Sequence, residues 1–182
     1  MSAFEFVFPL FGLLVGLSYT EMLAGLARAL KARRHVRIGW LVPLLGVLVL
    51  INLTMFWYGA WQLRDMAKPT SGSLLLILLV GGTYFLAASL VFPNPDDRST
   101  DLDEHFFSTR KMTLLAIAFC NLVALALVAD NAGWSLRPIW WAINSLFLAM
   151  LVATAFSQKR SVVTGLLTVM IGFHGLGIFF GR

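Results

Sequence analysis

Long apolar runs separated by short polar connections fill this 182-residue chain. Six of the runs are long enough to cross about 30 Å of hydrocarbon, which takes about 20 residues of α-helix. They cover residues 4–29, 38–62, 73–92, 111–129, 138–156 and 161–180. Helices are expected because backbone exposed to lipid must satisfy its own hydrogen bonds, and the alternation of a barrel strand is not visible. The pattern predicts an all-α bundle of six transmembrane spans forming one domain, residues 1–182.

The composition agrees with this prediction. Hydrophobic residues make up 59% of the chain and charged residues 13%, whereas a soluble domain has about half and about a quarter. The first apolar run lacks the basic leading region of a signal peptide, so we expect it to remain in the mature protein. The longest connection, residues 93–111, is too short to fold independently.

The net charge of +5 raises the question of nucleic-acid binding. The basic residues instead follow the connections, with ten on the side of the first, third and fifth connections and four on the other side. Because Lys and Arg are retained in the cytoplasm, the odd connections are expected inside and both termini outside. We therefore expect membrane lipid, and no nucleic acid, as a partner. The ten are Arg28, Lys31, Arg33, Arg34, Arg37, Arg98, Arg110, Lys111, Lys159 and Arg160; the four are Arg64, Lys68, Arg137 and Arg182.

Glu21 is the first candidate for chemistry because an ionisable group inside a bilayer is costly. Helical spacing places Ser18 on the same face of the first span. In one hypothesis Glu21 titrates during the movement of protons or cations. In the other it is structural, either protonated or hydrogen-bonded to Ser18, Tyr84 or Asn121.

Further polar residues in the spans are Asn52, Asn144 and His174. If they share a cavity with Glu21, Ser18, Tyr84 and Asn121, these residues together outline a pathway for ions, protons or a substrate. If they do not, they form hydrogen bonds between helices, each worth about 0.6 to 2 kcal/mol. His174 has no second histidine on its own side of the membrane to complete a haem site, and no His/Glu pair has helical zinc-ligand spacing. We expect no metal and no cofactor.

Gly12 and Gly16 form a small-xxx-small pattern in the first span, which allows two helices to approach closely. This spacing marks a packing face opposite Glu21. The first span is therefore expected either to be enclosed by the other spans or to lie at a homodimer contact. We expect a homodimer or a higher homo-oligomer.

The segment DLDEHFFSTRK, residues 101–111, is the most polar compact stretch. Its candidate residues are Asp101, Asp103, Glu104 and His105. Acidic residues just before a helix cap free backbone N–H groups and complement the positive helix end. The alternative is an interfacial regulatory or metal site. Since no hydrolase motif and no phosphate-binding glycine loop is present, we do not expect an enzyme.

Several stretches resemble a family of uncharacterised six-helix inner-membrane proteins of bacteria. They are FVFPLFGLLVGLSYTEMLAGLAR near the start, WLVPLL and FWYGAW in the second span, LVFP at the end of the third, and DLDEHFF followed by RK. The resemblance covers about the first two thirds of the chain. It implies a multi-pass protein of the bacterial inner membrane and no particular activity or functional residue.

Two functions are consistent with these features. The first is a small channel or transporter for protons, cations or a small solute that uses Glu21. The second is a non-transporting membrane scaffold, or a component that binds a partner protein or lipid through its glycine-lined helix faces and basic inner surface.

Overall fold

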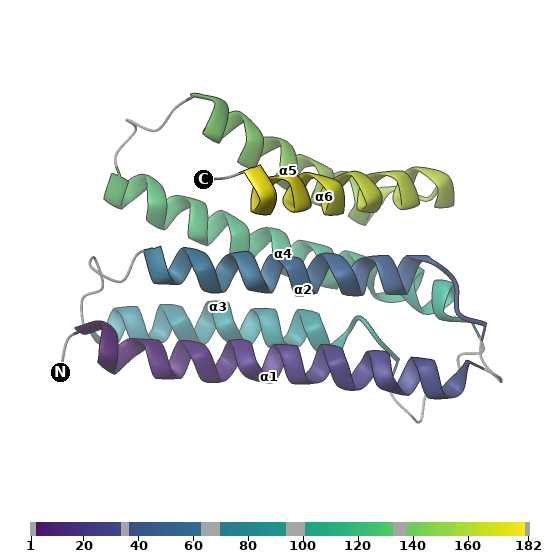
Figure 1. The fold of residues 1–182 in the computed structure, drawn as a ribbon, viewed down its shortest axis with the longest axis horizontal. Coiled ribbons are helices and arrows are strands. Elements are labelled where there is room, and N and C mark those ends of the chain that lie inside the picture. The colour runs from purple at the N-terminus through teal and green to yellow at the C-terminus, as the bar shows by residue number, and fades with distance from the viewer. Residues whose placement is uncertain (1–2, 34–36, 63–69, 94–100, 133–137, 181–182) are drawn as a thin grey trace.

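The computed structural model describes residues 3–33, 37–62, 70–93, 101–132 and 138–180. It contains six helices: α1 (Ala3–Ala32), α2 (Leu41–Gln62), α3 (Ser71–Ser89), α4 (Leu102–Ala132), α5 (Pro138–Phe156) and α6 (Arg160–Phe180). Successive helices run in opposite directions, so the connections alternate between the two ends of the bundle (Figure 1). The all-α prediction is confirmed. Within the described residues, α1 to α5 are long and apolar enough to cross a membrane.

The helix α4 differs most from its predicted span, because it begins at Leu102, well ahead of residue 111. Asp101 explains the early start: its Oδ1 accepts the Asp103 N–H at 2.8 Å, and its carbonyl accepts the His105 N–H. A side-chain oxygen at this position satisfies one of the free donors of a helix start. The polar segment after Asp101 is therefore a helical extension of the apolar span.

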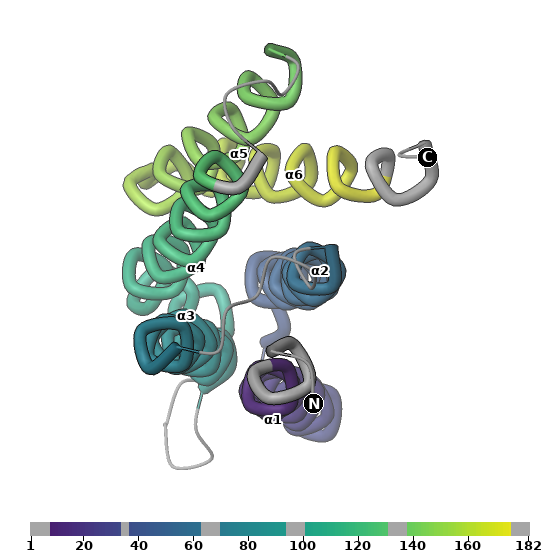
Figure 2. Tube along the Cα trace, turned by 90° about the vertical axis from the view of Figure 1, so that its left-hand side faces the viewer, coloured from purple at the N-terminus to yellow at the C-terminus, as the bar shows by residue number. Residues whose placement is uncertain are grey.

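The helix α2 lies at the centre of the bundle and contacts α1, α4 and α6 (Figure 2). In its most apolar stretch 44% of the residues are buried, compared with 28% for α1. The structure therefore does not enclose the first span. The physical reason is that α1 buries one stripe only, with three or four residues between successive positions. These positions are Phe11, Val15, Ser18, Met22 and Gly25.

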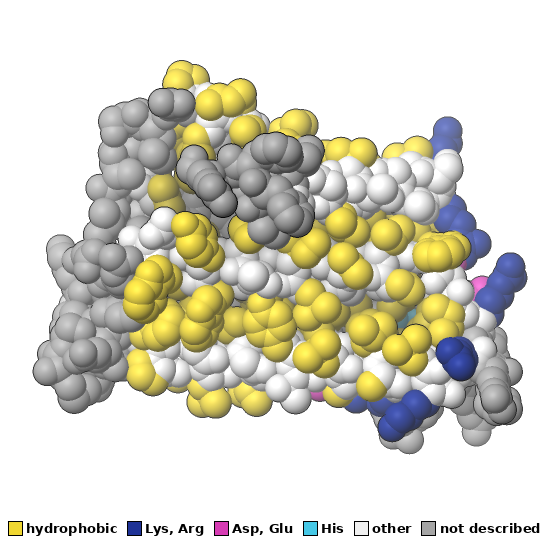
Figure 3. All heavy atoms as spheres, viewed as in Figure 1, with side chains coloured by type: hydrophobic (Ala, Val, Ile, Leu, Met, Phe, Trp, Pro, Cys, Tyr) yellow, Lys and Arg dark blue, Asp and Glu magenta, His cyan; other side chains and the backbone are white. Residues whose placement is uncertain are grey.

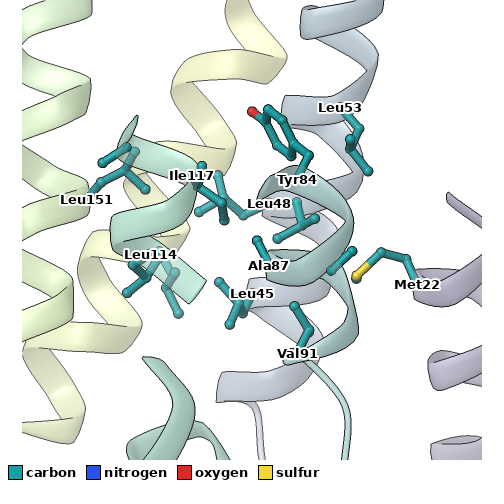
Figure 4. Close-up of a cluster of buried hydrophobic side chains, with 14 of the residues drawn as sticks. Met22, Leu45, Leu48, Leu53, Tyr84, Ala87, Val91, Leu114, Ile117 and Leu151 are labelled. Carbon is teal, nitrogen blue, oxygen red and sulfur yellow. The ribbon is translucent and has the colours of Figure 1, made fainter. Parts of the chain in front are cut away.

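The core is apolar and contains residues of all six helices, five of which contribute labelled side chains in Figure 4. Glycines allow α1 to pack closely against α3 and against Phe92, which follows α3. A Cβ atom at Gly81 would lie 2.7 Å from the Leu14 side chain, and a Cβ atom at Gly25 would overlap the Phe92 ring. These two glycines, rather than Gly12 and Gly16, permit the close packing of α1 against α3 and the segment that follows it.

Candidate functional site

Three polar side chains meet inside the bundle, one each from α2, α3 and α4. Tyr84 is fully buried and Asn52 is 3% exposed. The Tyr84 hydroxyl donates to Asn52 Oδ1. Asn121 Nδ2 lies 3.0 Å from the same oxygen and 3.2 Å from Tyr84 Oη. We call Asn52, Tyr84 and Asn121 the central cluster.

The central cluster joins residues from two groups that the sequence pattern kept apart. Tyr84 and Asn121 were candidate hydrogen-bond partners of Glu21, and Asn52 was grouped with Asn144 and His174. Asn121 Nδ2 also lies 2.9 Å from the carbonyl oxygen of Ile117, one turn earlier on α4. In an apolar setting, polar groups are stabilised when they bond to one another. The arrangement therefore links three helices at a single point.

Glu21 forms an ion pair along its own helix. Its Oε1 lies 3.0 Å from Nη2 of Arg28, which is seven residues further on. The two side chains are 31% and 38% exposed, respectively. Ser18 donates to the Leu14 carbonyl at 2.9 Å. The carboxylate is thus neutralised by Arg28, a residue that helical spacing places on the same face.

The remaining pathway candidates also bond within their own helices. Asn144 Nδ2 donates to the Trp140 carbonyl at 2.8 Å. His174 Nδ1 lies 3.2 Å from the Met170 carbonyl, and its ring centroid is 4.5 Å from that of Phe147. Neither contact links these residues to the central cluster.

The acidic segment connects the ends of several helices. Asp103 is 4% exposed; its Oδ1 accepts the N–H of Leu41, the first residue of α2, at 3.1 Å, and its Oδ2 pairs with Arg160 at the start of α6. His105 Nε2 lies 3.2 Å from the carbonyl of Leu90, which follows α3. Glu104 is exposed. Among the described residues, no group of three His, Cys, Asp or Glu could hold a metal ion.

Arg110 has a structural role that the sequence did not reveal. In the sequence it counted only among the basic residues that predict the orientation in the membrane. It is 2% exposed. Its Nε donates to the Ala155 carbonyl and its Nη2 to Gln158 Oε1, both at 3.1 Å. Its guanidinium also lies 4.5 Å from the centroid of the Phe107 ring. Because the last carbonyls of a helix have no partner within it, Arg110 caps the C-terminus of α5.

A groove of about 340 Å³ lies between α1 and α2. Its lining residues are Gly12, Val15, Gly16, Tyr19, Thr54 and Trp57. A Cβ atom at Gly12 would lie 3.1 Å from Trp57, whereas one at Gly16 would have nothing within 4 Å. The Tyr19 and Thr54 hydroxyl oxygens are 2.7 Å apart. Of the two predicted packing glycines, Gly12 makes a contact within the chain and Gly16 faces open space.

Comparison with known proteins adds no relative. No family model matches the chain, and neither the curated proteins nor the solved structures contain a match. The class of protein is therefore inferred from the sequence and structure of this chain. Among the described residues, its five long apolar helices are consistent with an integral membrane protein built as a helical bundle.

Proposed function

We propose that this chain is a six-span protein of the bacterial inner membrane and acts as a non-transporting component that binds lipid or a partner protein. The described Lys and Arg side chains gather at the end of the bundle where the first, third and fifth connections lie (Figure 3). This distribution supports an orientation with that end in the cytoplasm and both termini outside. The resemblance to bacterial inner-membrane proteins supports the same location.

One observation carries the choice against transport: the polar residues expected to line a pathway bond to one another or to their own helices. The central cluster occupies three of them, and Arg28 neutralises Glu21. The contacts of the central cluster join three helices and hold them in place in a membrane, where apolar surfaces alone give little preference for protein over lipid. The proposed function involves no enzymatic activity.

Transport remains the second candidate because of Glu21. Its side chain is 31% exposed within the apolar stretch of α1. An exposed carboxylate in a span is a reason to test for proton or cation movement. The ion pair with Arg28 predicts no flux, whereas the exposure of the Glu21 carboxylate predicts a flux that depends on this residue.

Flux through reconstituted liposomes separates the two candidates. We expect wild type and Glu21→Gln to be equally silent for H⁺, Na⁺ and K⁺ across pH, because Arg28 already pairs with the carboxylate and the polar residues of the central cluster bond to one another. Empty liposomes and an ionophore serve as controls. Flux by wild type that Glu21→Gln abolishes would contradict the proposed function and establish the transport hypothesis.

The orientation is tested by labelling single cysteines. Cys120 is the single cysteine of the chain, so Cys120→Ser gives a cysteine-free background. In intact cells, a membrane-impermeant thiol reagent should label Gln62→Cys and leave Lys31→Cys unlabelled. The reverse pattern would refute the proposed orientation.

Self-association is part of the proposal. Gly16 lies in the groove between α1 and α2 and leaves room for a close neighbour. Light scattering of the purified chain in detergent should give the mass of a dimer or a larger oligomer. A monomer at all protein-to-detergent ratios would contradict this expectation.

A further inference from the structure

We propose that the basic end of the bundle binds the headgroup of an anionic phospholipid at the corner where α4, α5 and α6 meet. This corner consists of Arg110, Lys111 and the segment 156–160. The proposal rests on the proposed function, because it names the lipid and the surface for a component that binds lipid. The argument is one of charge complementarity between this corner and a phosphate-bearing headgroup.

The fold brings together two pairs of basic residues that are far apart in the sequence. Arg110 Nη2 donates to Gln158 Oε1 at 3.1 Å, which places Arg110 beside the turn that carries Lys159 and Arg160. The Lys111 ammonium lies 5.5 Å from the centroid of the Phe156 ring, the last residue of α5. Four cations from two segments therefore occupy one corner.

The carboxylates near this corner do not cancel its positive charge. Asp103 is buried and is engaged by Arg160 and the Leu41 N–H. Glu104 is exposed and lies about two turns before Lys111 on α4. Lys111 and Lys159 are both exposed, and no carboxylate contact holds either of them among the described residues. These two lysines are the side chains available to an anion.

The corner lies at the depth of lipid headgroups. The 19 residues of α5 span about 28 Å, close to the thickness of the hydrocarbon core, and α5 ends at Phe156. Phe156 is 56% exposed and lies under the Lys111 ammonium. A lysine at a membrane boundary usually lays its aliphatic part on an apolar surface and directs its ammonium to the interface. Basic sites between helices on the cytoplasmic side suit anionic headgroups.

The experiment is native mass spectrometry of the full chain in detergent, titrated with phosphatidylglycerol or with phosphatidylcholine of the same acyl chains. We expect tighter binding of phosphatidylglycerol. A cation near an anionic membrane surface contributes about 1 kcal/mol, so Lys111→Gln and Lys159→Gln should each weaken that binding about fivefold, and the double variant about 30-fold. The matched control is Lys31→Gln with Arg33→Gln, two exposed basic residues at the end of α1 and directly after it, for which we expect a change of less than twofold.

Three results would overturn the proposal. One is equal binding of the two lipids, and another is an equal loss in the corner and control variants, which would indicate a diffuse basic surface. The third is complete displacement of the lipid by millimolar inorganic phosphate, which would identify a site for free phosphate. Circular dichroism melting of each variant without added lipid reports folding separately. Because the titration does not measure flux, failure of this proposal is distinguishable from failure of the proposed function.

Discussion

The substitution Tyr84→Phe tests whether the central cluster holds α2, α3 and α4 together. It removes one oxygen from a fully buried side chain and leaves the ring in place. The oxygen donates to Asn52 Oδ1 and accepts from Asn121 Nδ2 at 3.2 Å. Hydrogen bonds between membrane helices average about 0.6 kcal/mol and reach about 1.7. The variant loses both bonds of this oxygen, whereas the 3.0 Å contact between Asn121 Nδ2 and Asn52 Oδ1 does not involve Tyr84, so we expect a loss of about 1 to 2 kcal/mol.

The measurement is equilibrium unfolding in mixed micelles with increasing dodecyl sulfate, followed by circular dichroism. The matched control is Tyr58→Phe, which removes the same atom from an exposed tyrosine whose hydroxyl accepts from Gln62 within α2. We expect the control to change the free energy of unfolding by less than about 0.5 kcal/mol. Equal losses in the two variants would refute the reasoning, because burial and contacts between helices would then add nothing.

Two further substitutions test the packing of α1 and the start of α4. Gly25→Leu should lower the unfolding midpoint strongly because its Cβ atom would overlap the Phe92 ring, whereas Gly165→Leu, at an exposed position of α6 where an added Cβ atom has nothing within 4 Å, should have little effect; similar midpoints would contradict the contact between α1 and Phe92. Asp101→Ala should cost about 1 kcal/mol by removing the N-cap of α4, and Glu104→Ala, at an exposed position in the first turn, should cost less than about 0.5 kcal/mol. The same unfolding assay measures both, and an equal cost for the two alanine variants would argue against the cap.

The individual polar contacts were much less predictable than the helices. Asn52, Tyr84 and Asn121 were all recognisable as polar residues inside spans, but their mutual bonds depend on how α2, α3 and α4 are rotated about their axes. Apolar sequences define such rotations weakly, since many faces are equally suited to lipid. Glu21 illustrates the opposite case. Its partner Arg28 lies on the same helix, so regular helical spacing was enough to place them on one face.

The sequence by itself determined the class of protein, because the length of its apolar runs reflects the thickness of a bilayer. It also determined that the basic residues favour alternate connections, and it located α5 at residues 138–156. Only the tertiary structure decided that α2, and not α1, lies at the centre. It alone placed Arg110 at the end of α5 and the Lys111 ammonium 5.5 Å from the centroid of the Phe156 ring. Contacts of this kind join residues about 45 positions apart, and they form only once the helices have packed in one arrangement.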